Sequence, residues 1–114
     1  MQPDDIYLAG FPFGGGGGMK LRPVLLLTNS PVGSVPEVLV AYISSVAPPT
    51  LLPSDVLLDP MVAQHSSPNL KIASVLRLHK LATIHRRMIV RRLGVLSPMA
   101  SAEVDRKLRE LLGL

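Results

Sequence analysis

The apolar residues of this chain fall into short runs that are separated by proline and glycine. Runs of this length, rich in Val, Leu and Ile and bounded by turn residues, are typical of β-strands. The predicted strands span residues 6–11, 24–28, 38–45, 56–58, 73–81 and 88–96. Residues 82–87 are expected to form a turn or a single helical turn. The strands at 24–28 and 38–45 are the most continuously apolar, so we expect them to form a central antiparallel pair.

The C-terminal part follows a different pattern. Ser97 is a preferred helix N-cap residue, and Pro98 then occupies the position where helices best tolerate proline. Four apolar residues recur at helical spacing after it, namely Val104, Leu108, Leu111 and Leu112. Charged residues fill the opposite side, so we expect an amphipathic helix that lies on the sheet or on a partner. Residues 1–114 are therefore predicted to form one mainly β domain, a small, strongly bent barrel or open sheet with a C-terminal helix.

Composition narrows the classes of partner and compartment. Twelve Lys and Arg against eight Asp and Glu give a net charge of +4, which favours an anionic partner. The chain has no cysteine, so disulfides and thiolate metal sites are excluded. Its first residues carry two acids where a signal peptide has a positive region, and its apolar runs are far shorter than the ~20 residues of a membrane-spanning helix. We expect a soluble protein of a bacterial-type cytoplasm with no membrane association.

A run of five glycines, residues 14–18, precedes the second predicted strand. Consecutive glycines carry the largest backbone entropy cost of ordering, so this segment is expected to be a mobile loop. Lys20, Arg22 and Pro23 follow it directly. Because Pro23 restricts Arg22 to extended backbone angles, we expect Arg22 to stand at the start of the strand at 24–28, with its backbone fixed and its side chain available for chemistry.

The glycine run does not fit either common nucleotide-binding motif. The triphosphate loop requires Gly-Lys-Ser/Thr followed by a helix, whereas Lys20 lies between Met19 and Leu21 and a strand follows. The dinucleotide pattern G-x-G-x-x-G fails because its last glycine would fall on Met19. No mononucleotide or dinucleotide cofactor is therefore expected.

The three histidines do not predict a metal site. His65, His79 and His85 lack zinc-ligand spacing, and no acid occurs between Met61 and Ala102. His79 and His85 are in principle an acid and base pair, but histidines among arginines are more commonly solvated side chains. We therefore expect no metal and assign these histidines no catalytic role.

Positive charge is concentrated between residues 71 and 92, without any carboxylate to balance it. The residues are Lys71, Arg77, Lys80, Arg86, Arg87, Arg91 and Arg92. Such a cluster is typical of nucleic-acid backbone binding, but it suits an acidic segment of a partner protein or a solvated face as well. Aromatic residues are nearly absent, so a standard single-strand stacking platform is not indicated. Composition alone leaves RNA and an acidic peptide equally open.

Several segments of the sequence resemble the MazF/PemK toxins of bacterial type II toxin-antitoxin systems. They are DIYL at 5–8 with FPF at 11–13, KLRPVLLLTN at 20–29, VAYIS at 40–44, LPSDV at 52–56, SVLRL at 74–78 with LATI at 81–84, and RLG at 92–94. The most specific part is an Arg-Pro pair that opens a hydrophobic strand after a glycine-containing loop, followed by a second hydrophobic strand that ends in Ile and a hydroxyl residue.

The resemblance implies a fold, an activity and partners. The fold is an SH3-like (MazF/CcdB-like) barrel of five to seven short strands with a C-terminal amphipathic helix. The activity is endoribonuclease cleavage of single-stranded RNA, including mRNA, without a metal or another cofactor, and it inhibits growth. The implied partners are a second copy of the chain in a homodimer and a cognate antitoxin whose acidic segment covers the RNA groove. DNA is contacted only indirectly, through the antitoxin.

The resemblance also assigns roles to residues. The catalytic Arg of the family falls on Arg22, and its catalytic Thr falls on Ser44, which keeps the hydroxyl. The residues implied in RNA binding are Phe13, Gly14, Gly15, Gly16, Gly17, Gly18, Lys20, Arg77 and Lys80. Cleavage beside a ribose can use the neighbouring 2′-hydroxyl as nucleophile, so the protein has to supply positioning, proton transfer and charge neutralisation. An arginine fork suits the last task because it donates two parallel hydrogen bonds to phosphate oxygens.

Two other functions remain open at this level. A non-catalytic module of the same barrel, like the CcdB-type gyrase poisons, acts by binding a protein target. A degenerate toxin has lost activity and binds only its antitoxin. The Arg-Pro and Ile-Ser combination favours the endoribonuclease, because the CcdB-type proteins do not use these positions as an RNA site.

Overall fold

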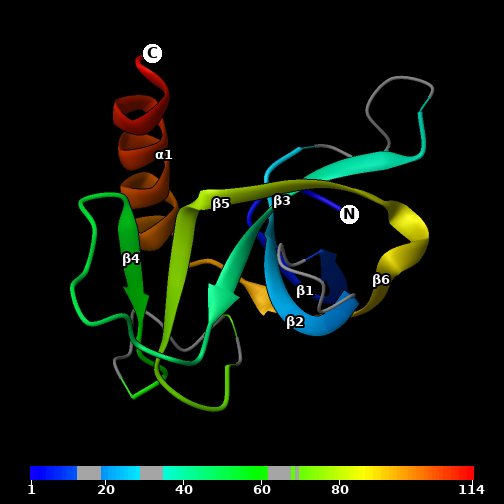
Figure 1. Cartoon of the computed structure of the whole chain (residues 1–114), viewed down its shortest axis with the longest axis horizontal. Helices are drawn as coiled ribbons and strands as arrows, with labels where there is room; N and C mark the ends of the chain where they lie inside the picture. Colours follow the sequence, from blue (N-terminus) through cyan, green and yellow to red (C-terminus); the bar gives the residue numbers. More distant parts are fainter. Residues whose placement is uncertain (13–18, 29–34, 62–67, 69) are drawn as a thin grey trace.

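The computed structural model describes residues 1–12, 19–28, 35–61, 68 and 70–114. The elements in chain order are β1 (Asp5–Pro12), β2 (Met19–Leu26), β3 (Glu37–Ser44), β4 (Asp55–Leu58), β5 (Ser74–His85), the 3-10 turn η2 (Arg86–Met88), β6 (Ile89–Val95) and α1 (Pro98–Leu112) (Figure 1). The predicted glycine loop at 14–18 lies outside the described residues.

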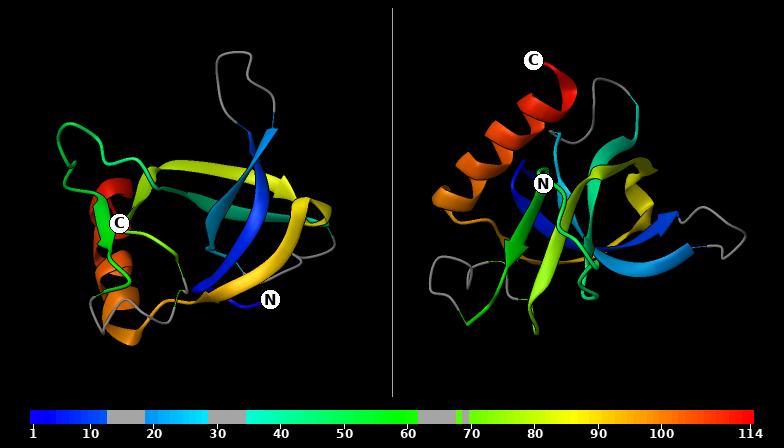
Figure 2. Two further views of the ribbon diagram at one scale, coloured as in Figure 1. Left: turned by 90° about the horizontal axis from the view of Figure 1, so that it is seen from below. Right: turned by 60° about the vertical axis from the view of Figure 1, so that its left-hand side comes forward.

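The six strands form one sheet in the order β4-β5-β3-β2-β1-β6, and every neighbouring pair is antiparallel. β2 and β3 pair at its centre, with Val24 opposite Tyr42, which confirms the predicted central pair. The sheet is strongly curled, and α1 lies beside β4 at one end of it in all three views (Figures 1 and 2). The predicted mainly β class with a C-terminal helix is confirmed.

Both faces of the curled sheet are buried, each in its own apolar cluster. Side chains alternate across a strand, so Leu25 and Ile43 enter one cluster, while Val24 and Tyr42 enter the other. We call the first cluster the helix-side core, because it also contains Ala100 and Val104 of α1. The second cluster is called the opposite core. Because both faces are buried, the strand sequences are nearly continuous apolar runs and do not alternate strictly between apolar and polar residues.

The predicted start of the second strand was wrong. β2 begins at Met19, five residues before the predicted position, because it pairs with β1 from Pro12 opposite Met19 onward. Arg22 therefore lies inside β2, opposite Ala9, rather than at its first residue. Pro23 is tolerated there because the ladder to β3 begins only at Val24, and proline is accepted where a strand lacks a neighbour on one side.

The predicted end of the fifth strand was also wrong. β5 continues to His85 through the segment expected to turn, and the turn follows as η2. The long pairing with β3, from Glu37 opposite His85 to Ser44 opposite Val75, holds this segment extended. The register shifts between Ala41 and Tyr42 of β3, and the three residues Leu78, His79 and Lys80 of β5 are left over in a bulge.

The predicted helix start is confirmed at Pro98. The Ser97 hydroxyl accepts a hydrogen bond from the amide of Ala100 at 3.1 Å, and Gly113 ends the helix in the left-handed region at φ 73°. The first turns pack on the sheet, whereas Leu111 and Leu112 are exposed. Within the described residues, no helix is both long enough and apolar enough to cross a membrane.

Candidate nucleic-acid interface

Arg22 and Ser44 lie on neighbouring strands at the same end of one sheet face. The β2–β3 ladder ends with Val24 opposite Tyr42. Arg22 is two residues before Val24, and Ser44 is two residues after Tyr42. Because residues two apart on a strand share a face, both belong to the face of the opposite core, and continuing the register sets them opposite each other. The pairing of β2 with β3 thus places two residues that are more than twenty positions apart in the sequence at the same end of the sheet.

The same end of this face carries two lysines and two aromatic rings. The rings of Phe11 and Tyr42 have their centroids 5.2 Å apart, and Lys80 Nζ lies 5.6 Å from the centroid of Tyr42. Lys20 is exposed and lies opposite Phe11 in the β1–β2 ladder. Lys20, two residues before Arg22 on β2, and Lys80, beside the Tyr42 ring, therefore add positive charge to the face that carries Arg22, an arrangement suited to a polyanion.

The Ser44 hydroxyl is buried and held by the chain that follows it. Its oxygen accepts from the amide of Val46 at 3.1 Å, and its proton is donated to the Val46 carbonyl at 3.0 Å. The amide bond fixes the position of the oxygen, while the proton can rotate to another acceptor. Arg22 is half-buried, and its Nη1 donates to the Leu21 carbonyl at 2.9 Å, which uses one of the five guanidinium donors.

A cavity of about 430 Å³ lies on the other side of the same strand ends, and we call it the rear cavity. Leu21 and Pro23 line it, and they share the face of the helix-side core, because they alternate with Arg22. Arg22 also lines it and so lies at the border between the two faces. The remaining lining among the residues that the structure describes is Leu8, Ser45, Leu70, Lys71, Ile72, Ser74, Arg91 and Leu93, none of which is a carboxylate.

Four polar residues that line this cavity received no site role from the sequence, namely Ser45, Lys71, Ser74 and Arg91. Lys71 and Arg91 were recognised only as members of the basic segment. Arg91 reaches the cavity because it lies opposite Leu8 in a β1–β6 ladder that shifts register twice. No local sequence signal marks those shifts, whereas Ser45 was within reach of prediction because it directly follows Ser44.

Arg77, which was predicted to bind RNA, is paired within the protein. It lies opposite Tyr42 in the β3–β5 ladder and therefore shares the face of Arg22 and Ser44. Its Nε donates to Asp55 Oδ1 at 2.8 Å, and the Asp55 side chain is fully buried. The charge of Arg77 is thus balanced internally by a buried carboxylate. Phe13 and Gly14 to Gly18 lie outside the described residues.

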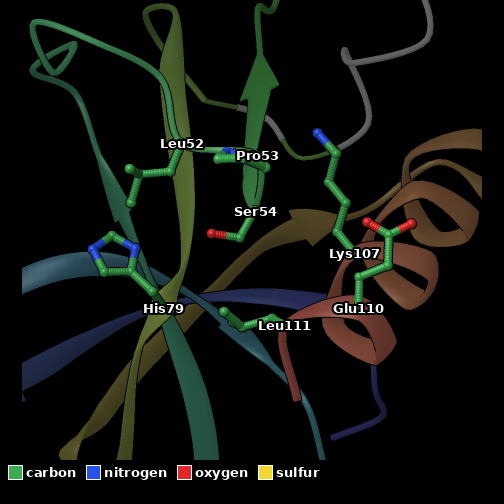
Figure 3. Close-up of a pocket in the computed structure, with 7 residues that line it drawn as sticks. All are labelled: Leu52, Pro53, Ser54, His79, Lys107, Glu110 and Leu111. Atoms are coloured by element: carbon green, nitrogen blue, oxygen red, sulfur yellow. The ribbon is translucent and has the colours of Figure 1, made fainter. Parts of the chain in front are cut away.

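His79 belongs to a second cavity, of about 360 Å³, between β5 and α1 (Figure 3). Leu52, Pro53 and Ser54 form one side, and Lys107, Glu110 and Leu111 of the helix form the other. Burial lowers the pKa of His79, and the positive charge of Arg77 lowers it further. This histidine is therefore neutral near pH 7.

His85 has a structural role at the other end of β5. Its Nδ1 accepts from the amide of Arg87 at 3.0 Å and caps η2. Six strand positions separate it from His79, a span of about 20 Å for extended backbone, so the two histidines do not act on one substrate atom. Across the described residues, no group of three or more His, Asp or Glu side chains is placed to hold a metal ion.

Solved structures with the same fold cover nearly the whole chain. An endoribonuclease from a mycobacterial species, in complex with its cognate antitoxin, has a TM-score of 0.75 and 16% identity over 100% of this chain and 96% of its own. The Mycobacterium tuberculosis toxin MazF-mt6 has a TM-score of 0.74 and 23% identity over 96% of this chain and 97% of its own. MazF from Deinococcus radiodurans in the MazE-MazF complex has a TM-score of 0.73 and 20% identity over 100% of this chain and 97% of its own. At these identities the likeness establishes a MazF-like fold.

The sequence itself matches one family over almost its full length. A search of curated proteins found no match. The family described as PemK-like, MazF-like toxin of type II toxin-antitoxin system matches residues 2–112. This range includes every strand and the helix that position Arg22 and Ser44. The chain belongs to the PemK-like, MazF-like toxins of type II toxin-antitoxin systems.

Proposed function

We propose that this chain is a metal-independent endoribonuclease that cleaves single-stranded RNA and thereby inhibits growth. The observation that supports it best is that Arg22 and Ser44 share one end of one sheet face, with Lys20 and Lys80 beside them. Two structural relatives from mycobacteria are named endoribonucleases. The +4 net charge of the chain favours an anionic substrate.

In the proposed reaction, the RNA 2′-hydroxyl attacks the adjacent phosphorus. The new bond joins the 2′-oxygen to phosphorus, and the bond from phosphorus to the 5′-oxygen of the next nucleotide breaks. The 2′-hydroxyl loses its proton, and the departing 5′-oxygen gains one, so the products are a 2′,3′-cyclic phosphate and a 5′-hydroxyl. The Arg22 fork binds two phosphate oxygens and strengthens these bonds as negative charge develops on them.

Ser44 assists by holding the same phosphate. Because the Val46 amide fixes the Ser44 oxygen, the hydroxyl proton can turn from the Val46 carbonyl to a phosphate oxygen without moving the side chain. Such a preplaced donor costs little reorganisation during the reaction. Lys20 and Lys80 bind neighbouring phosphates and hold the strand across the site.

A single 2′-deoxy nucleotide tests this reaction. Cleavage sites are first mapped on a long RNA, and an oligonucleotide spanning one site is then made with and without deoxyribose on the 5′ side of the cut. We expect the deoxy substitution to abolish cleavage at that bond and leave cuts elsewhere unchanged, because it removes the nucleophile. Cleavage of the deoxy oligonucleotide at an undiminished rate refutes the mechanism. Growth arrest with intact cellular RNA points instead to a protein target.

The two adjacent serines predict different losses. Ser44→Ala is expected to lower the single-turnover cleavage rate by about 10²- to 10³-fold, since it removes one preplaced donor to the reacting phosphate. Ser45→Ala is expected to lower it by less than about tenfold, because Ser45 lines the rear cavity instead. Ser44→Thr retains the hydroxyl and most of the rate. The reverse order of losses assigns the donor to Ser45.

The proposal includes two protein partners. A cognate antitoxin with an acidic segment suits the basic face around Lys20 and Lys80, and homologues have been crystallised with their antitoxins. Leu111 and Leu112 leave an apolar strip exposed on the last turn of α1, which suits a homodimer. Sedimentation equilibrium at micromolar concentration is expected to give the mass of two chains, and a monomer there contradicts the dimer.

A further inference from the structure

The rear cavity has no role in the proposed reaction, apart from Arg22 at its border. Its volume of about 430 Å³ falls in the range of small-molecule sites. It is the open end of the helix-side core, bounded by Leu8 and Leu93 on β1 and β6. Arg22 lies at its border, so a ligand in the cavity is adjacent to the proposed reaction site.

Most side chains that line this cavity are aliphatic, and cationic and hydroxyl side chains lie among them. Leu8, Ile72 and Leu93 supply apolar surface, and Lys71 and Arg91 supply exposed positive charge. No carboxylate is among the described lining residues. A flat, weakly polar ring attached to a phosphate matches both parts of this surface, which is the chemistry of a nucleotide. Aliphatic side chains and an arginine plane replace the aromatic rings of a usual base-stacking platform.

The strand order places the two arginines on opposite sides of the cavity. Leu8 of β1 lies opposite Pro23 on β2 and opposite Arg91 on β6. The backbone of Arg91 is therefore two strand spacings, about 10 Å, from the backbone of Pro23, which directly follows Arg22. With one arginine on each side, the cavity has a cation for each of the two phosphates that flank a single nucleotide.

We propose that the rear cavity holds the nucleobase next to the cleaved phosphate, and that Arg91 and Lys71 bind the phosphate on the far side of this base. The inference rests on the proposed function, because it takes the phosphate at Arg22 as the one that is cleaved. Arg91 and Lys71 are then positioning residues that set where the RNA strand lies along the site.

Binding of a non-cleavable RNA tests the phosphate contact separately from catalysis. The probe is a fluorescein-labelled decamer of mixed-sequence 2′-O-methyl RNA, and its dissociation constant is measured by anisotropy at several salt concentrations. Arg91→Ala is expected to weaken binding by about fivefold or more and to reduce the slope of log K against log salt by about 0.7, the loss of one phosphate contact. Arg109→Ala removes the same charge from the exposed face of α1 and is expected to change neither quantity appreciably.

A decamer of abasic 2′-O-methyl nucleotides tests the base contact. The protein is expected to bind it at least about fivefold more weakly than the base-bearing decamer, as expected for one seated base. Ile72→Asp places a carboxylate in the cavity at a residue that is 58% exposed, so the fold is retained. In this variant the ratio of the two affinities is expected to fall towards one.

The outcomes separate this inference from the proposed function. Equal effects of Arg91→Ala and Arg109→Ala, or equal affinities for the two decamers, overturn the cavity assignment while RNA cleavage still supports the function. Absence of RNA cleavage by a protein that passes both binding tests overturns the endoribonuclease and retains the cavity as a nucleotide site. If an acidic peptide binds in the cavity more tightly than either decamer, the cavity is assigned to a protein partner. This result also overturns the inference.

Discussion

Replacing Arg22 with alanine is expected to reduce the single-turnover rate of RNA cleavage by about 10³-fold or more. Removal of one preplaced donor to a developing charge typically costs 10² to 10³ in rate, and arginines that bind a transferring phosphoryl group are worth about 10³ to 10⁵. Arg22 supplies a charge and a fork of donors at the proposed reacting phosphate. A loss of about 10³ corresponds to about 4 kcal/mol of transition-state stabilisation.

Two further variants show whether the loss comes from the Arg22 side chain itself. Arg22→Lys keeps the charge but loses the paired donors, so a rate between those of the wild type and Arg22→Ala is expected. Arg109→Ala removes a charge of the same sign from an exposed pair on α1 and is expected to cleave at the wild-type rate. Thermal unfolding of each variant is measured alongside, because Arg22 is half-buried within β2. Undiminished cleavage by a folded Arg22→Ala protein removes this residue from the active site.

Asp55→Ala is expected to lower the free energy of unfolding by about 3–5 kcal/mol. The Asp55 carboxylate is fully buried, and it accepts from Arg77 Nε and from the Leu52 amide, each at 2.8 Å. Truncation leaves the Arg77 side chain, only 14% exposed, without its counter-charge, and removes the acceptor of the Leu52 amide. Removing one partner of a buried pair is strongly destabilising for this reason.

Urea unfolding monitored by circular dichroism measures this loss. The matched control is Asp105→Ala, which breaks the pair between Asp105 and Arg109, whose side chains are 67% and 62% exposed. It is expected to cost less than about 0.5 kcal/mol, since solvent screens an exposed pair. A cost below about 1 kcal/mol for Asp55→Ala contradicts the structural role that we give to the ion pair.

Local sequence patterns were sufficient for the arrangement of the core. The apolar runs around Val24 and Tyr42 predicted the central pair because each strand is buried on both faces and so carries few polar positions. Ser97 and Pro98 predicted the start of α1 because capping depends on neighbouring residues alone. The family resemblance then assigned roles to Arg22 and Ser44, which strand pairing brings to the same end of one face.

Local sequence patterns did not predict the features that depend on pairing between strands distant in the sequence. β2 starts at Met19 because β1 pairs with it there, although Met19 to Arg22 are mostly exposed. The bulge of β5 at His79 and the register shifts of β6 near Arg91 depend on the curvature of the whole sheet rather than on nearby residues. For the same reason, the rear cavity and the cations around it became apparent only from the structure.

The central claim is that this chain cleaves RNA at its own arginine without a metal, and one assay tests it most directly. Purified wild-type protein and Arg22→Ala are each incubated with single-stranded RNA in excess EDTA, and the ends of the products are identified by mass spectrometry. We predict fragments with a 2′,3′-cyclic phosphate and a 5′-hydroxyl from the wild type, and intact RNA from Arg22→Ala over the same time. Intact RNA in both samples, or equal cleavage in both, contradicts the claim.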